Sequence, residues 1–173
     1  MITGERLAEQ AVKGGYIGMP YSEVDCQAFV EKVISDLGIR KPDGTVYNWR
    51  GSNSMYRNYY SWRGTISECK TTFGIIPQGA LIYKRKNDGG EKEKGYTDGL
   101  GNFYHVGIYI GDDDRMIIHS SGGGVQYATK LNGWTNITLL SFIDYTGKND
   151  DNNIKDLINR IRADIDKLEG LIL

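Results

Sequence analysis

The stretch HVGIYIGDDDRMIIHS, residues 105–120, decides the fold of this chain. Two apolar runs flank a turn-forming GDDD segment, which predicts two antiparallel strands joined as a hairpin. Both histidines of the chain, His105 and His119, lie in this hairpin. If a three-residue loop pairs Ile110 with Asp114, the two imidazoles lie directly opposite each other on one face of the sheet. A loop of even length would put them on opposite faces.

Helical patterns precede the hairpin. Residues 5–13 carry apolar side chains at helical spacing, and a second such run extends from Cys26 to Leu37. Asp25 is a plausible N-cap for the second helix, and Gly38 follows its end. Cys26 is therefore expected in the first helical turn, on the face that packs on the core.

Strand-like segments dominate the rest of the first 147 residues. We expect a loop-rich aromatic excursion at 41–64, acting either as a cleft wall or as a small satellite core, and a polar excursion at 84–103. Strands are predicted at 80–83, 105–110, 115–120, 125–128 and 137–145. Helices followed by antiparallel strands predict an α+β fold, with N-terminal helices packed on a small antiparallel sheet.

The last 26 residues differ in composition from the rest. A GKNDDNN linker precedes apolar residues spaced by four and three positions, at Ile154, Ile158, Ile161, Ile165, Leu168 and Ile172. This heptad pattern predicts a C-terminal amphipathic helix, so we divide the chain into a domain at 1–147 and a linker with helix at 148–173. The helix can pack on its own domain, form a homo-oligomer with copies of itself, or begin a longer helix.

Charge and composition exclude several classes of partner. The formal net charge of -1 provides no broad cationic surface for nucleic acid, and the apolar runs are too short for a membrane span. The N-terminus lacks the layout of a secretory signal. Two cysteines do not form a disulfide framework, although a single bridge between Cys26 and Cys69 remains open.

A thiol in a first helical turn lies near the positive end of the helix dipole, which lowers its pKa. A nearby imidazole, His105, can take the thiol proton, and a polar group such as His119 can orient that imidazole. The alternatives are an inert core cysteine, hydrogen-bonded strand histidines, or a zinc site formed by the same three residues. Compact metal-binding motifs are missing, so we expect no metal and no other cofactor, and we assign Cys69 a structural role.

Four motifs, DCQAFV, IPQGALIY, HVGIYIG and IIHSSGGGV, follow one another in an order that resembles the NlpC-type cell-wall cysteine peptidases. These are papain-like enzymes that cut peptidoglycan stem peptides, and the resemblance covers residues 5–145. It implies a papain-like fold with Cys26 as the nucleophile, His105 as the base and His119 as the third polar residue.

The resemblance also implies three substrate-binding residues. Asp25 falls where the family recognises the free amine of the substrate, and Tyr21 resembles a family tyrosine near the oxyanion site. Gln27 stands where the family usually has serine, and Ala28 where it usually has glycine. Gln27 is therefore expected to replace the serine or to favour a different acyl donor.

The expected activity is that of a peptidoglycan hydrolase, a cysteine endopeptidase that cleaves the γ-D-glutamyl to diamino-acid bond. Alternatives are an N-acetylmuramoyl-L-alanine amidase, an acyltransferase on the same fold, and a non-catalytic binding or assembly module. The expected partner is the peptidoglycan stem peptide. The expected place of action is the cell wall, either outside a bacterial cell or as part of a phage.

Overall fold

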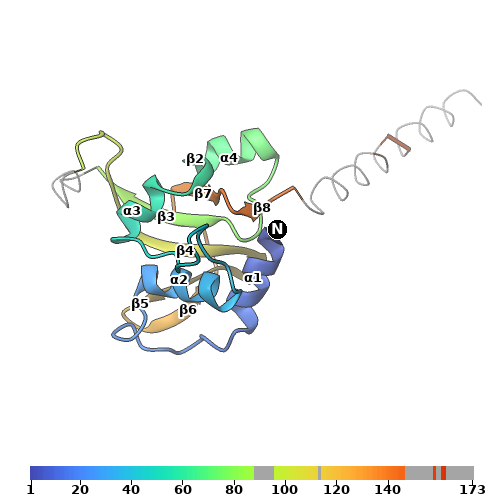
Figure 1. Ribbon diagram of the computed structural model, residues 1–173. Helices are drawn as coiled ribbons and strands as arrows, with labels where there is room; N and C mark the ends of the chain where they lie inside the picture. The colour runs from blue at the N-terminus through green and yellow to red at the C-terminus, as the bar shows by residue number, and fades with distance from the viewer. Residues whose placement is uncertain (88–95, 113, 147–157, 159–160, 163–173) are drawn as a thin grey trace, which may run out of the picture.

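The computed structural model describes residues 1–87, 96–112, 114–146, 158 and 161–162. Helices and a six-stranded antiparallel sheet give the chain an α+β fold, as predicted, and the strand order in the sheet is β2-β7-β3-β4-β5-β6 (Figure 1). The elements in chain order are β1 (Ile2–Thr3), α1 (Gly4–Lys13), α2 (Cys26–Asp36), α3 (Ser52–Arg57), β2 (Tyr60–Thr65), α4 (Ile66–Phe73), β3 (Leu81–Lys86), β4 (Asn102–Asp112), β5 (Arg115–Ser121), β6 (Gly124–Ala128), β7 (Asn136–Leu140) and β8 (Ile143–Asp144).

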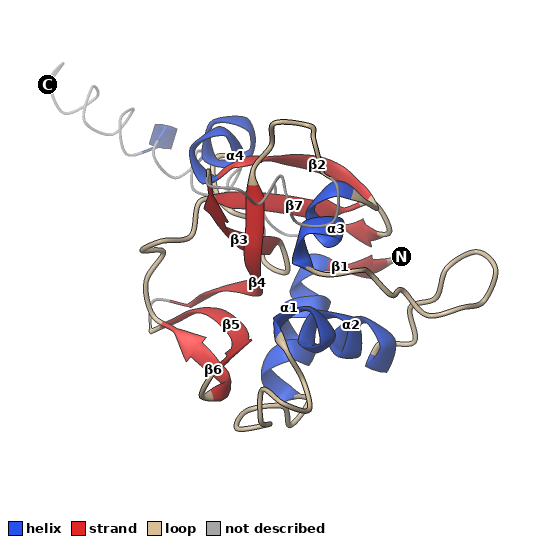
Figure 2. Cartoon of the chain, turned by 90° about the vertical axis from the view of Figure 1, so that its left-hand side faces the viewer, coloured by secondary structure: helices blue, strands red, loops and turns tan. Residues whose placement is uncertain are grey.

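Helices cover both faces of the sheet, unequally. Figure 2 shows α1, α2 and α3 along one side of β4, and α4 beside β2 and β7. Alternation along β4 separates two cores, because Val106 and Ile108 pack with α2 while Tyr109 packs with the core next to α4. The histidine face of β4 is thus the face turned away from α2.

The two predicted N-terminal helices form as expected. In α2, the Asp25 carboxylate accepts a hydrogen bond from the backbone N–H of Ala28 at 2.8 Å, so Asp25 is the N-cap. The helix ends at Asp36 with Leu37 as its C-cap. Phe29 and Val33 are fully buried on the core face of this helix.

The loop predicted at 41–64 is wrong in its second half, where α3 and β2 form. The segment is mainly core, since Tyr47, Trp49 and Tyr56 are buried in the cluster that includes α2. A six-residue helix and a strand with an irregular register are too short to impose a period on the sequence.

The sequence pattern predicts no helix around Cys69, but one forms. Cys69 lies in α4, where Thr65 and Glu68 form a reciprocal capping box. Its side chain is fully buried between α4 and the sheet, so its structural assignment stands.

The β4–β5 hairpin forms, but its predicted register is wrong by two residues. Ile108 pairs with Ile118 and Tyr109 with Ile117, which places His119 opposite Gly107 and diagonal to His105. Near the turn, Asp112 pairs with Arg115. If this register continued along both strands, the two imidazoles would lie on opposite faces of the sheet.

The register of β4 and β5 shifts by one residue between Tyr109 and Asp112, and this shift changes the face on which the side chains beyond it lie. Gly111, at a φ of 84°, lies within this irregularity, and a left-handed glycine is typical of a bulge that adds one residue to one strand. The added residue brings His105 and His119 back to one face.

The single strand predicted at 137–145 is wrong, because it divides into β7 and β8. A turn at Ser141 and Phe142 separates them, and β8 leaves the large sheet to pair in parallel with β1. The N-terminus and the end of the described domain are thus held together at Ile2 and Ile143.

The predicted heptad helix and linker at 148–173 lie outside the described residues, apart from Ile158, Ile161 and Arg162. That prediction and the associated domain boundary stay predictions. None of the helices in the described part of the chain is long and apolar enough to cross a membrane.

Candidate active site

The thiol of Cys26 lies where β4 and β5 separate. The hydrogen-bonded ladder between these strands begins at Ile108 and Ile118, so Val106 lies beyond its end. The backbone N–H of Val106 donates to the Cys26 thiol, which is 7% exposed. Cys26 therefore contacts the residue that directly follows His105.

Ser120 connects β5 to the segment that leads into α2. Its buried hydroxyl donates to the carbonyl oxygen of Val24, two residues before Cys26. The start of α2 is thereby tied to β5, next to His119.

The two imidazoles form a hydrogen-bonded pair where β4 and β5 separate. His105 Nε2 lies 2.9 Å from His119 Nδ1, with the rings perpendicular at an interplanar angle of 89°. In the tautomer in which His105 Nε2 carries the hydrogen and donates it to His119 Nδ1, Nδ1 of His105 is the ring nitrogen that can take a proton from a thiol. Proximity of the histidines was predicted, and they meet diagonally because Gly107 has no side chain between them.

Trp134 covers the histidine pair. Its ring centroid lies 5.3 Å from that of His105 and 5.4 Å from that of His119, and its side chain is 5% exposed. Burial lowers the pKa of both histidines to about 4; His119 and then Lys84 contribute to the shift of His105, and Lys84 contributes to that of His119. Both imidazoles are neutral at pH 7.

The predicted lowering of the thiol pKa is wrong for this structure. Burial raises the pKa of Cys26, and the charge of Asp25 raises it further. Backbone N–H groups of Val106, Gln27 and Cys26 itself act in the opposite direction but do not outweigh the burial. The resting pair is therefore a neutral thiol and a neutral imidazole.

Tyr21 and Asp25 both lie near the thiol, and their roles in substrate binding stay predictions. The pKa of Tyr21 is raised by partial burial, by the charges of Cys26 and Asp25, and by a hydrogen bond with the Cys26 side chain. The exposed Asp25 uses one carboxylate oxygen for the cap of α2, and the other is available to a ligand.

Gln27 is engaged elsewhere. Its side-chain amide donates to Glu31 and to the backbone carbonyl of Trp49, while Glu31 accepts from the backbone N–H of Trp49. These bonds attach the 40–50 segment to α2. Gln27 therefore anchors this segment in the structure, and its substrate contact stays a prediction.

Three contributors were missed by the sequence reasoning: Lys84, Ser120 and Trp134. Trp134 lies in an LNGWTN loop without periodicity, so no sequence pattern could place it on the histidines. Ser120 carried a usable signal, because it adjoins His119 in the sequence. Lys84 was assigned to the polar excursion at 84–103, and only the pairing of β3 with β4 places it opposite His105.

The alternatives for the thiol can be compared with the geometry. Cys26 and Cys69 are both free, so they form no bridge. Within the described residues, no group of three or more histidine, cysteine, aspartate or glutamate side chains is arranged to hold a metal ion.

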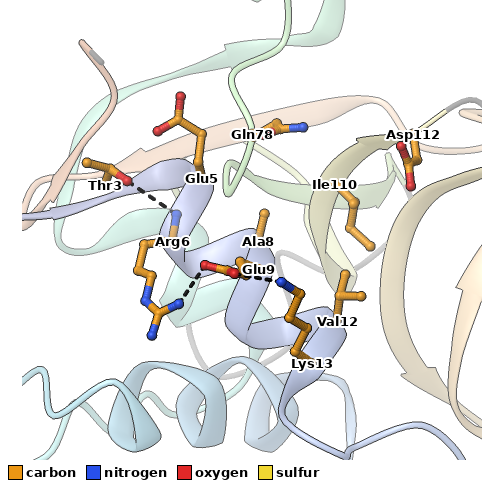
Figure 3. A pocket seen from close by; sticks show the side chains of 10 residues that line it. All are labelled: Thr3, Glu5, Arg6, Ala8, Glu9, Val12, Lys13, Gln78, Ile110 and Asp112. Carbon is orange, nitrogen blue, oxygen red and sulfur yellow. Dashed lines mark hydrogen bonds and ion pairs between the residues drawn. The ribbon is translucent and has the colours of Figure 1, made fainter. Parts of the chain in front are cut away.

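Two surface cavities lie away from Cys26 and the histidines. One, of about 630 Å³, lies between α1 and the β4 end of the sheet (Figure 3). Its charged groups are largely paired with each other, since Glu9 binds both Arg6 and Lys13. The second, of about 600 Å³, is lined by Trp62, Phe73 and Tyr145 among others. Neither includes the candidate active site.

Comparisons with known proteins identify no relative: no family model, no curated protein and no solved structure matches this chain. The fold and the site geometry are therefore the basis for a functional assignment.

Proposed function

We propose that this protein is a papain-like cysteine hydrolase that cleaves peptidoglycan stem peptides at the γ-D-glutamyl to diamino-acid bond. The observation that carries the proposal is the hydrogen-bonded pair of His105 and His119, together with a thiol in the first turn of α2 that contacts Val106, the residue next to His105. The ordered motifs around these residues supply the substrate class. The cell wall is the proposed place of action.

In the proposed mechanism, the N–H at Nε2 of His105 donates a hydrogen bond to Nδ1 of His119. The unprotonated Nδ1 of His105 is then the base. As the Cys26 sulfur attacks the amide carbon, its proton passes to His105, which later gives it to the leaving nitrogen. Water then hydrolyses the acyl-enzyme. Because both partners are neutral at rest, proton transfer accompanies the attack instead of preceding it.

The start of α2 supplies groups for the oxyanion. The N–H of Ala28 is taken by the Asp25 cap, whereas those of Cys26 and Gln27 are directed at the thiol. These two N–H groups, with the hydroxyl of Tyr21, are the proposed donors to the developing negative charge. The free oxygen of Asp25 is the proposed contact for the substrate amine.

The test is digestion of purified cell walls by the wild type and by Cys26→Ala, followed by mass spectrometry of the released fragments. Cys69→Ala is the matched control, because it removes the other buried thiol, which lies on α4 and outside the cluster that contains Cys26, and it should retain activity. New diamino-acid amino termini, seen only with an intact Cys26, are expected.

Other products would identify a different function. New L-alanine amino termini would indicate an amidase, and transfer of the acyl group to an added amine would indicate an acyltransferase. Equal release by the wild type and Cys26→Ala would contradict a thiol hydrolase and favour a binding module.

A further inference from the structure

Lys84 lies beside the candidate active site on the histidine face of the sheet. It pairs directly with His105 across β3 and β4, so the two side chains project on the same side. Lys84 Nζ lies 5.0 Å from the ring centroid of Trp134, the same indole that covers both imidazoles. A cation is therefore built into the wall of the site.

Within the described part of the chain, no carboxylate forms an ion pair with Lys84. The half-buried position of this lysine limits screening by water. The cation opposes formation of an imidazolium on His105, which the proposed mechanism requires. An anion bound at Lys84 during turnover would remove that opposition.

The placement of Lys84 indicates which part of a substrate it meets. Cys26 approaches β4 from the α2 side, whereas Lys84 and Trp134 lie on the opposite face, beyond His105. The catalytic base later protonates the leaving nitrogen, so the residue carrying that nitrogen lies next to His105. Groups beyond His105 contact the leaving side of the scissile bond.

We propose that Lys84 binds the side-chain carboxylate of the residue that supplies the leaving amine, and so selects stem peptides with diaminopimelate over those with lysine. The proposal rests on the proposed hydrolase function. Diaminopimelate carries a second carboxylate at the end of its side chain, and lysine has none there. A charge-assisted hydrogen bond in a partly buried site is sufficient for discrimination of about tenfold to a hundredfold.

The test compares two synthetic tripeptides, L-Ala-γ-D-Glu-meso-diaminopimelate and L-Ala-γ-D-Glu-L-Lys, as substrates of the wild type, Lys84→Met and Lys84→Arg. The wild type should have a kcat/KM at least tenfold higher for the diaminopimelate peptide. Lys84→Met should lose this preference by falling on that peptide alone, and Lys84→Arg should keep most of it. Lys86→Met is the control, because Lys86 lies over Tyr104 and away from Trp134.

Equal kcat/KM values for the two peptides with the wild type would overturn the proposal, as would an equal loss on both in Lys84→Met. Amidation of the side-chain carboxylate of diaminopimelate provides a test that needs no variant. It should lower the kcat/KM of the wild type at least tenfold.

A binding measurement distinguishes a failure of the proposed hydrolase function from a failure of the proposed role of Lys84. If the wild type cleaves neither peptide, the proposed function is wrong, and calorimetry with meso-diaminopimelate and lysine decides the role of Lys84. Binding of meso-diaminopimelate that is at least tenfold tighter than that of lysine, and that is lost in Lys84→Met, would support the carboxylate site. Equal binding of the two amino acids would overturn it.

Discussion

At the residue scale, the candidate site is held neutral by its surroundings. Burial raises the pKa of the Cys26 thiol and lowers the pKa of His105 and His119 to about 4. These shifts act together against a resting thiolate–imidazolium pair. The folded protein therefore carries no buried thiolate–imidazolium pair at rest, and in the proposed mechanism these charges form only during the reaction.

The histidine pair predicts a stability that depends on pH. Both imidazoles have a pKa of about 4 in the folded protein against a usual value of 6.5. Between these values the unfolded chain binds more protons, so the free energy of unfolding falls as the pH is lowered from 6.5 to 4. At about 1.4 kcal/mol per pKa unit, the full shift of one imidazole corresponds to about 3.5 kcal/mol. Because the two imidazoles interact and the site keeps some solvent contact, we expect a total loss of about 2–4 kcal/mol.

Urea denaturation at pH 7 and at pH 4.5 measures this loss. The double variant His105→Asn/His119→Asn serves as the control, since it keeps polar side chains but has no imidazole to titrate. Its stability should fall less than that of the wild type over the same interval. Parallel losses in the two proteins would show that carboxylates, and not the histidines, cause the dependence.

At the element scale, the β4–β5 hairpin brings the histidines together through two glycines with different roles. Gly111 provides the left-handed residue within the irregularity that restores the parity of the strand. Gly107 provides space, because a Cβ there would lie 2.8 Å from the Ile117 side chain and 3.0 Å from the His119 Cβ. The diagonal contact of the imidazoles depends on both.

Replacement of Gly107 by alanine is expected to damage the site and the fold together. The added methyl group would collide with the side chains of Ile117 and His119 on β5. The hydrogen bond between His105 and His119 would become longer. We expect a loss of about 1–3 kcal/mol in the free energy of unfolding and at least a tenfold loss of hydrolysis. Urea denaturation and peptide cleavage assays measure the two effects.

Gly122→Ala is the matched control in the turn between β5 and β6. A Cβ at Gly122 meets no atom within 4 Å, so stability and activity should change little. Full activity of Gly107→Ala would mean that the imidazole pair is not needed for catalysis.

At the scale of the whole molecule, the described domain is organised around two cores on the two faces of one sheet. The parallel pairing of β1 with β8 joins its N-terminus to Asp144, shortly before the predicted linker. The first and last strands of the domain therefore pair with each other before the predicted heptad segment. Association through that segment would leave the fold of the domain unchanged.

Sedimentation of the full chain and of a chain ending at Lys148 tests the predicted tail. The isoleucine-rich heptads should make the full chain associate, and the shorter chain should be a monomer with unchanged thermal unfolding. Identical monomers would contradict self-association and favour a helix that packs on its own domain. A large drop in thermal stability on truncation would support that packing.

Much of the fold followed from local pattern. The α+β class, the first two helices, the Asp25 cap and the hairpin were readable because periodicity and capping chemistry are properties of neighbouring residues. The α3, β2 and α4 elements were missed, since each is short. The division between β7 and β8 depends on pairing with β1, more than 130 positions away in the chain.

The sequence by itself determined which residues carry the chemistry of the candidate site: Cys26 at a helix start, with His105 and His119 on one hairpin. Only the tertiary structure decided how they meet, because the bulge at Gly111, the cover by Trp134 and the charge of Lys84 come from segments distant in sequence or from irregular backbone. Burial is also a tertiary property. It reversed the direction in which the helix start alone would move the thiol pKa.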